Sequence, residues 1–225
     1  MKIGIIVAMD KEQELLLPLL EDATTSQKGN FTFHSGRVGK HEVTVMRCGI
    51  GKVNAAMGAL TLVNEFAPDH IINSGVAGGA ATDVHVLDVV AGARVAYHDV
   101  WCGPECELGQ VQGLPLYYEG DADLLTALPQ RDIIKRGLIC SGDQFVDDLQ
   151  QLQRIQASFP EVLAVDMESG AIAQVCKVCN VPFLSLRVIS DSPGASRDNT
   201  RQYLDFWSDA PRESFEILRD MLNNL

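Results

Sequence analysis

Three carboxylic acids, Glu12, Glu168 and Asp191, each follow a short apolar run of the chain. Carboxyl groups can donate a proton, accept one, or stabilise positive charge that develops on a substrate. Each residue also has a structural alternative, because an acidic side chain at the start of a helix is stabilised by the helix dipole or caps the helix. The three acids are therefore candidates for acid–base chemistry if the fold brings them together.

The segment 162–191 contains two of these acids and predicts a strand, a helix and a second strand. Residues 162–165 are short and β-branched, whereas 169–179 place small and apolar residues at helical spacing. Residues 183–189 are largely apolar, which favours a second buried strand. The two acids then come just past the carboxyl ends of strands, at the edge where open α/β sheets bind their ligands.

The rest of the chain also alternates short strands with helices. We expect strands at 2–8, 31–35, 42–48, 70–73, 94–97 and 137–140, helices at 11–20, 53–66, 121–128, 148–157 and 212–225, and an irregular stretch at 98–115. No linker, repeat or low-complexity tract divides the chain, so residues 1–225 indicate one α/β domain.

Charge and hydropathy limit the function classes of this 225-residue chain. The formal net charge is −12 and 46% of the residues are hydrophobic, which disfavours disorder and a surface for nucleic acids or anionic membranes. No apolar run approaches the roughly 18 residues that span a bilayer. The apolar run 3–9 ends at Asp10-Lys11-Glu12 without a signal cleavage site, so we expect a cytoplasmic enzyme.

Six cysteines are scattered through apolar surroundings, and two of them form a Cys176-x-x-Cys179 motif. An activated thiolate needs a helix N-terminus, but this pair falls at the end of a predicted helix. No second pair has the spacing of a zinc site. We therefore expect reduced structural thiols and no metal centre.

Two glycine-rich segments and one aromatic residue could contribute to a ligand site. Gly49-Ile50-Gly51-Lys52 precedes a predicted helix and could bind phosphate or form a tight turn, although it lacks the rest of a dinucleotide or Walker motif. Residues 75–79, Gly-Val-Ala-Gly-Gly, follow a predicted strand and allow either close packing or close approach of a ligand. With Phe145 and the acids, they would suit a planar, polar ligand that is neutral or cationic. His98-Asp99 is interpreted as structural, because adjacent residues rarely face each other.

Six motifs occur in an order that resembles a known family. They are Ile3-Gly-Ile-Ile-Val-Ala-Met-Asp-Lys-Glu12, Cys48-Gly-Ile-Gly-Lys-Val-Asn54, Ile71-Ile-Asn-Ser-Gly-Val-Ala-Gly-Gly79, Ser141-Gly-Asp-Gln-Phe145, Val165-Asp-Met-Glu-Ser-Gly-Ala-Ile-Ala173 and Arg187-Val-Ile-Ser-Asp191. Over most of its length the chain resembles the nucleoside phosphorylase/nucleosidase superfamily, and within it the 5′-methylthioadenosine/S-adenosylhomocysteine nucleosidases. The resemblance implies a single domain with a central mixed, twisted β-sheet, partly barrel-like and flanked by helices.

The resemblance also implies hydrolysis of an adenine N-glycosidic bond. Asp191 would be the general acid at adenine N7, Glu12 the general base for the attacking water, and Glu168 the group that binds the ribose 2′-hydroxyl. These residue types suit the reaction, because a purine leaving group needs a proton and an oxocarbenium-like transition state needs nearby negative charge. No metal or organic cofactor is required.

Further residues have substrate-binding roles by resemblance. Phe145 would stack on adenine, the backbone of Val146 would read its edge, and Met167 would pack against the ribose. Ser190 would support the general acid, and Arg187 the water and the carboxylates around it. The other implied contacts to the small nucleoside are Met9, Ile50, Val76, Ala77, Gly78 and Tyr203.

The chain departs from the family pattern at three places. Val76 stands where many of these nucleosidases carry a serine, which removes a hydroxyl contact to the water. Met9-Asp10-Lys11-Glu12 replaces the arginine-bearing loop with which related phosphorylases bind phosphate, and this favours water as the nucleophile. The segment 101–113, through which the family reaches into the site of a second subunit of a homodimer, lacks the usual aromatic pair. Tyr203 and Phe206 are candidates to close over the 5′-end from the same chain.

Other assignments are open on the residues alone. The close alternatives are a nucleosidase for another 5′-modified adenosine, such as aminodeoxyfutalosine, and a purine nucleoside phosphorylase. A nucleoside-binding module without turnover is disfavoured, because all three acids are present. A dinucleotide-dependent oxidoreductase is disfavoured by the absent glycine fingerprint.

Overall fold

The strands form one mixed sheet that partly closes on itself. The computed structural model describes residues 1–193, 199–208 and 212–225. Within these residues the strands are β1 (Lys2–Val7), β2 (Glu21–Lys28), β3 (Phe31–Val38), β4 (His41–Arg47), β5 (His70–Gly79), β6 (Val89–Tyr97), β7 (Tyr118–Glu119), β8 (Ile134–Ser141), β9 (Val162–Asp166) and β10 (Phe183–Asp191). Their order is β10-β6-β8-β9-β5-β1-β4-β3-β2, with β7 beside β6. Because β5 pairs with β10 as well as with β9, the strands β5, β9, β8, β6 and β10 close into a barrel, which confirms the expected mixed, partly barrel-like sheet.

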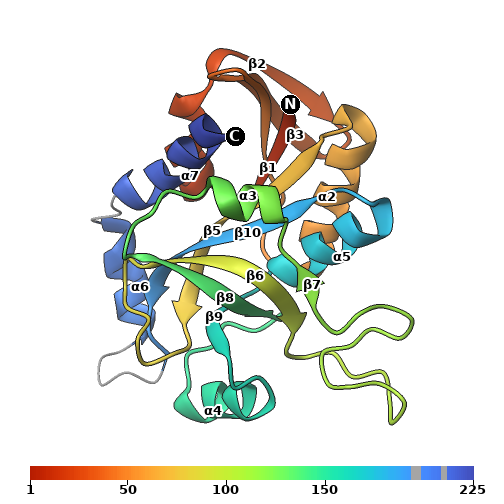
Figure 1. Ribbon diagram of the computed structural model, residues 1–225, viewed down its shortest axis with the longest axis vertical. Helices are drawn as coiled ribbons and strands as arrows, with labels where there is room; N and C mark the ends of the chain where they lie inside the picture. The colour runs from red at the N-terminus through yellow and green to blue at the C-terminus, as the bar shows by residue number, and fades with distance from the viewer. Residues whose placement is uncertain (194–198, 209–211) are drawn as a thin grey trace.

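Helices flank this sheet on several sides. They are α1 (Asp10–Leu16), α2 (Lys52–Phe66), α3 (Ala122–Ala127), α4 (Leu149–Ser158), α5 (Ser169–Cys179), α6 (Asn199–Ser208) and α7 (Arg212–Asn224), with a 3₁₀ turn at Leu17–Leu19. The helices α2 and α5 lie together at one flank, and α6 and α7 lie at the opposite flank (Figure 1). None of the helices in the described ranges is both long and apolar enough to cross a membrane.

Strand β10 is the element that most directly positions the predicted site. All of its residues are buried, because β5 pairs with it in parallel on one side and β6 antiparallel on the other. Side chains alternate between the two faces of a strand, so Leu184, Leu186 and Val188 enter the hydrophobic core while Ser185 and Arg187 share the opposite face. The sequence of β10 therefore places polar groups on one side of a strand that is apolar on the other.

Several expected boundaries are corrected. Residues 75–79 were expected to follow a strand, but they belong to β5, because β10 continues beside them as far as Asp191. The expected helix 11–20 ends as α1 at Leu16, and the chain continues as a 3₁₀ turn with Pro18 in its first positions. The turn between β3 and β4 is also shorter than expected, since β3 extends to Val38. The remaining expected helices, including the terminal one, are confirmed within a few residues.

Three elements, β2, β7 and α6, were not expected. Strand β2 is exposed at every residue and polar, so no alternation of apolar side chains marks it, and it is held by pairing with β3. Strand β7 has only two residues. Helix α6 does carry a signal, since Tyr203, Phe206 and Trp207 stand at helical spacing.

Candidate active site

A cavity of about 330 Å³ gathers the predicted acids where several strands end. A cavity of this size suits a small ligand. Its lining residues are Ala8, Met9, Glu12, Ile50, Val76, Ala77, Gly78, Gln144, Phe145, Val146, Val165, Asp166, Met167, Glu168, Ser190, Asp191 and Tyr203. Among the predicted site residues, Arg187 and Phe206 are absent from this lining, and Phe206 is buried in the hydrophobic core.

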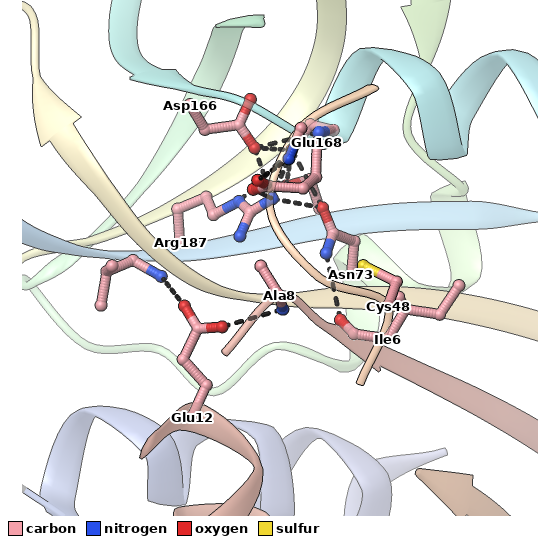
Figure 2. Close-up of polar contacts among 12 residues, drawn as sticks. Ile6, Ala8, Glu12, Cys48, Asn73, Asp166, Glu168 and Arg187 are labelled. Carbon is pink, nitrogen blue, oxygen red and sulfur yellow. Dashed lines mark hydrogen bonds and ion pairs between the residues drawn. The ribbon is translucent and has the colours of Figure 1, made fainter. Parts of the chain in front are cut away.

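Glu12 is buried in α1 and is held by three backbone N–H groups. Its Oε2 accepts hydrogen bonds from Ala8 and Met9, both at 2.9 Å, and its Oε1 accepts one from Val76 at 3.0 Å. Figure 2 shows the carboxylate reaching the backbone of Ala8. Burial raises the pKa of Glu12 above its ordinary value, while the charge of Arg187 and the three N–H groups oppose the rise. A carboxylate with a fixed position and raised proton affinity suits a general base.

Asp191 ends β10 at a β-bulge. The register between β10 and β5 shifts between Ile189 and Asp191, so Ser190 and Asp191 both line the cavity instead of pointing to opposite faces. The Ser190 hydroxyl donates to Asp191 Oδ1 at 2.5 Å. Burial raises the pKa of Asp191, whereas hydrogen bonds from Ser190 and Asn199 lower it. A carboxyl group with raised proton affinity can deliver a proton to a bound base.

Glu168 lies between a glycine turn and an arginine. Its Oε1 accepts a hydrogen bond from the backbone N–H of Gly51 at 3.0 Å, and its Oε2 lies 3.6 Å from Arg187 Nη2. Burial raises the pKa of Glu168, and Arg187 opposes the rise. Gly51 has a φ of 91°, a conformation that favours glycine. The turn before α2 therefore does bind an anion, and that anion is the side chain of Glu168.

Arg187 does not line the cavity, although the resemblance implies that it supports the water and the carboxylates there. Its side chain is 0% exposed, because it projects into a polar cluster inside the fold. It forms an ion pair with Asp166 and donates to Asn73, and Figure 2 shows these groups gathered around Glu168. Arg187 therefore acts on a ligand only through the carboxylates that it holds.

Gly75 separates Arg187 from Glu12. A Cβ atom at this position would lie 2.6 Å from Glu12 Oε1 and would also overlap Arg187 Nη1. That nitrogen has no hydrogen-bond partner among the described residues. Only glycine at this point of β5 lets the guanidinium approach the carboxylate closely enough to oppose the rise in the pKa of Glu12.

Aromatic and apolar side chains complete the lining. Phe145 and Tyr203 meet edge to face with ring centroids 5.7 Å apart, and the Tyr203 hydroxyl lies 3.2 Å from Met9 Sδ. Phe145 is 45% exposed, so part of its ring is available to a ligand. Such a ring can stack on a planar base.

A charged network joins two loops that carry lining residues. Lys52 Nζ lies 2.9 Å from both carboxylate oxygens of Asp99, and Asp99 accepts a hydrogen bond from the backbone of Asp143 at 2.9 Å. Asp143 in turn accepts one from the backbone of Lys52 at 2.7 Å. Neither His98 nor Asp99 lines the cavity. In the part of the chain that the structure describes, no group of three or more His, Cys, Asp or Glu residues could hold a metal ion.

Sequence reasoning missed two kinds of site residue. Four lining residues are neighbours in sequence of predicted ones: Ala8, Gln144, Val165 and Asp166. All four lie inside the quoted motifs, and this was a usable signal for them. Asn73, which accepts from Arg187, lies inside the motif 71–79, whereas Asn199, which donates to the backbone of Val146, lies outside every motif.

Comparison of the sequence with known proteins identifies the family to which this fold belongs. A family profile described as the Phosphorylase superfamily matches residues 2–223, and the chain belongs to this superfamily. The 5′-methylthioadenosine/S-adenosylhomocysteine nucleosidase of Maridesulfovibrio salexigens is 41% identical over 198 residues, covering 85% of this chain and 86% of the relative. The nucleosidase of the same name from Anoxybacillus flavithermus is 38% identical over 232 residues, covering 100% of this chain and 99% of the relative. Within the superfamily, these relatives place the chain among the 5′-methylthioadenosine/S-adenosylhomocysteine nucleosidases.

Solved structures give the same class. The S-adenosylhomocysteine nucleosidase of Streptococcus pyogenes, in complex with 5-methylthiotubericidin, has a TM-score of 0.94 and 38% identity, covering 100% of this chain and 97% of that one. A futalosine hydrolase mutant of Helicobacter pylori has a TM-score of 0.91 and 28% identity, covering 100% and 99%. The fold is thus shared by enzymes named for different substrates.

Proposed function

We propose that this protein hydrolyses the N-glycosidic bond of 5′-methylthioadenosine and S-adenosylhomocysteine, releasing adenine and the 5′-substituted ribose. The observation that carries the proposal is the convergence of Glu12, Glu168 and Asp191, from distant parts of the chain, on one cavity. The names of the relatives support the choice of substrates. The roles of the individual acids are inferred from their surroundings.

Asp191 is the general acid of the proposed reaction. An adenine anion is a poor leaving group, and protonation at N7 lets the base leave in neutral form. Burial raises the pKa of Asp191, which favours the protonated form that this step needs. Phe145 stacks on the base, and the backbone of Val146 contacts its edge, since both residues line the same cavity.

Glu12 acts on the attacking water, and Glu168 acts on the ribose. Glu12 takes the proton from the attacking water, and its three backbone donors keep its oxygens in place while it does so. Glu168 binds the ribose 2′-hydroxyl, and its negative charge stabilises the oxocarbenium-like transition state more than the ground state. Arg187 and Gly51 hold Glu168 in position for this task.

Water is the proposed nucleophile in preference to phosphate. No Lys, Arg or His side chain of the described residues lines the cavity, whereas four carboxylates do. A phosphate dianion would therefore meet negative charge without a compensating cation. Val76 contributes its backbone N–H to Glu12 and, unlike a serine, offers no hydroxyl to the water.

The direct test follows base release from 5′-methylthioadenosine, S-adenosylhomocysteine, inosine and adenosine by purified protein. We expect adenine from the two 5′-thio substrates without added phosphate, and no acceleration when phosphate is present. Base release that depends on phosphate would instead identify a phosphorylase. Tight binding of the nucleosides without any release would identify a binding module.

A nucleosidase for another 5′-modified adenosine is the second candidate. The similarity to a futalosine hydrolase supports it, and so does the segment 101–113, which contributes no lining residue to the cavity of its own chain. The ratio of kcat/KM for 5′-methylthioadenosine and aminodeoxyfutalosine, measured in competition, decides between the two. A preference for the second substrate would overturn the first assignment.

A homodimer is the proposed assembly. Helix α2 exposes Val53, Met57 and Leu60 at helical spacing, which forms an apolar stripe on the surface. The loop between β6 and β7 projects from the body of the molecule (Figure 1), and it exposes Trp101 and Leu108. A second copy would cover the stripe, and its projecting loop would complete the 5′-end of the cavity.

The cytoplasm is the proposed compartment. All six cysteines are free, including Cys176 and Cys179 of the paired motif. Burial raises the pKa of the Cys176 thiol and keeps it in the unreactive protonated form. Free, unpaired cysteines are typical of a reducing compartment.

A further inference from the structure

The N-terminus of α2 binds two carboxylates that come from other parts of the chain. The backbone N–H of Gly51 donates to Glu168 Oε1 at 3.0 Å, and the next backbone N–H, that of Lys52, donates to Asp143 Oδ1 at 2.7 Å. The first turn of α2 contains no acidic residue of its own. Unpaired N–H groups and the helix dipole favour negative charge at this end of a helix. Glu168 and Asp143 therefore share one helix terminus, on adjacent amides.

Asp143 is held at this terminus by a second set of contacts. Its backbone N–H donates to Asp99 Oδ2 at 2.9 Å, and both carboxylate oxygens of Asp99 lie 2.9 Å from Lys52 Nζ. That nitrogen also lies 5.3 Å from the centre of the Tyr97 ring. The side chains of Lys52 and Asp99 are 24% and 16% exposed, so solvent and salt screen this ion pair less than one on the open surface. Lys52 and Asp143 are thus joined directly and also through Asp99.

The carboxylate of Asp143 also packs against the residue that donates to Glu168. A Cβ atom at Gly51 would lie 3.0 Å from Asp143 Oδ1. Glycine has more conformational freedom than any other residue, so a turn built on it depends on contacts from outside the turn. Neither Gly51 nor Asp143 lines the cavity. Asp143 can therefore act on a ligand only through a residue that does, and its contacts lead to Glu168.

We infer that Asp143 is a positioning residue that holds the Gly51 turn, and with it the carboxylate of Glu168, where Glu168 binds the ribose 2′-hydroxyl. This inference rests on the proposed function, in which Glu168 has that role. It gives Asp143 and its partners Lys52 and Asp99 a part in the reaction, although none of the three lines the cavity.

The physical basis is the sensitivity of a catalytic group to small displacements. The charge of Glu168 stabilises the transition state more than the ground state, so a shift of its oxygens affects the rate more than binding. Without the Asp143 side chain, the Gly51 N–H would keep its bond to Glu168, but the two groups could move together. Arg187 would still hold the other oxygen, Oε2, at 3.6 Å. The loss of activity should therefore be partial.

The test compares two substrates, 5′-methylthioadenosine and its 2′-deoxy analogue, in wild type and in Asp143→Ala. The ratio of the two kcat values reports the contact to the 2′-hydroxyl, and any loss of folded or assembled protein cancels in this ratio. Asp143→Asn keeps an oxygen that can accept from the Lys52 N–H. Asp121→Ala is the matched control, since Asp121 accepts from the backbone of Leu124 at 3.0 Å in the first turn of α3, away from the cavity lining.

We expect Asp143→Ala to lower kcat for 5′-methylthioadenosine by roughly 10-fold with little change in KM, the lower end of the loss typical of a hydrogen bond to a charged group. The 2′-deoxy substrate should lose less, so the ratio of the two kcat values should fall by about threefold or more. Asp143→Asn should recover most of the wild-type ratio, and Asp121→Ala should retain it.

Two results would overturn the inference and leave the proposed function intact. One is an equal loss for both substrates in Asp143→Ala, which would show that the side chain does not act through Glu168. The other is an Asp143→Asn variant with the same ratio as the alanine variant, which would show that the hydrogen bond to Lys52 is not the cause.

Binding measured by calorimetry separates the two proposals. Adenine has no ribose, so it should bind Asp143→Ala as it binds wild type, and weaker binding would show that Asp143 acts on the base instead. If the wild-type protein binds 5′-methylthioadenosine but releases no adenine, the proposed function fails. The dissociation constants of the two nucleosides then replace the rates in the same comparison and decide the role of Asp143. A protein that binds neither nucleoside would overturn both proposals.

Discussion

Glu12, Glu168 and Asp191 carry the same functional group, and their surroundings suit them to different tasks. Burial raises the pKa of all three. For Glu12 and Glu168 the positive charge of Arg187 is the main opposing influence, whereas for Asp191 it is hydrogen bonds from uncharged side chains. A carboxyl group with raised proton affinity that is opposed only by neutral donors is suited to carry a proton into the reaction.

Asp191→Asn is expected to abolish most of the turnover. The variant keeps the shape of the side chain but has no transferable proton, so kcat should fall by about 10²- to 10⁴-fold. Binding of adenine should persist, because Phe145 and Val146 are unchanged. Steady-state kinetics and calorimetric titration measure the two quantities. Near-native kcat in this variant would remove the assigned role.

The acid limb of the pH profile belongs to Glu12. A general base acts in its ionised form, so activity falls as the pH decreases through the pKa of Glu12. Burial raises that pKa, and the limb should therefore lie above the ordinary value of 4.5. In Glu12→Gln the remaining activity should be low and should lose this limb. A profile of unchanged shape in the variant would contradict the assignment.

At the scale of elements, two neighbouring strands determine where these side chains lie. The bulge at the end of β10 brings Ser190 and Asp191 to the same side, and β5 supplies the small residues that allow close approach. One residue of β5, Gly75, lies between a buried cation and a buried carboxylate. Strand β5 is rich in small residues, but at Gly75 it has no room for a side chain.

Gly75→Ala tests that constraint. The added methyl group would displace Glu12 Oε1 and Arg187 Nη1, so we expect kcat/KM to fall by at least roughly 100-fold, since small displacements of catalytic groups have large effects. Gly79→Ala is the matched control on the same strand, because its Cβ would meet the side chains of Ile189 and Val84. Kinetics with thermal unfolding as a check on folding measure both. Equal effects of the two substitutions would contradict the argument.

At the scale of the whole molecule, one cavity gathers acids from β10, from the start of α5 and from α1, and the flanking helices provide much of the outer surface. The apolar stripe on α2 and the projecting loop after β6 are the features that a single copy leaves exposed. Contact between apolar side chains and water is unfavourable, and association of two copies would bury these side chains.

Met57→Glu is expected to weaken this association. A charge in the middle of the stripe would have to be desolvated at the interface, so the dimer should dissociate at micromolar concentration and activity should fall with it. Sedimentation velocity measures the assembly. Leu204→Glu on α6, at the opposite flank in Figure 1, is the control for an exposed apolar residue and should remain dimeric. A monomeric wild-type protein with full activity would contradict the proposed assembly.

Asp191 also links the stability of the molecule to pH. Its folded-state pKa lies above the ordinary value of 3.8, so this acid contributes stability that is complete below that pH and is lost as the pH rises through the folded pKa. Asp191→Asn has no such loss. Its free energy of unfolding relative to wild type should therefore increase between about pH 4 and about pH 8. Urea unfolding at both pH values measures the change, and an unchanged difference between the two proteins would contradict the argument.

Much of the fold was accessible from local pattern. The apolar runs that became β1, β9 and β10 and the helical spacing in α2 and α5 were sufficient to predict these elements, because burial imposes its periodicity directly on the sequence. Strand β2 could not be predicted in this way, since its stability comes from pairing with β3 and its side chains are exposed. The six motifs predicted the family by resemblance, and with it the partly closed barrel. The profile match confirms the family.

By itself, the sequence determined the identity of the acids, the order of the motifs and the class of the protein, because these depend on which residues are present and at what spacing. Only the tertiary structure decided that Arg187 lies behind the cavity and that Asn199 reaches the backbone of Val146. It also decided that the glycine turn before α2 binds Glu168. The physical reason is that these contacts join residues from separate elements. Their geometry depends on strand register, a β-bulge and helix placement, and the periodicity of apolar residues along the chain predicts none of these.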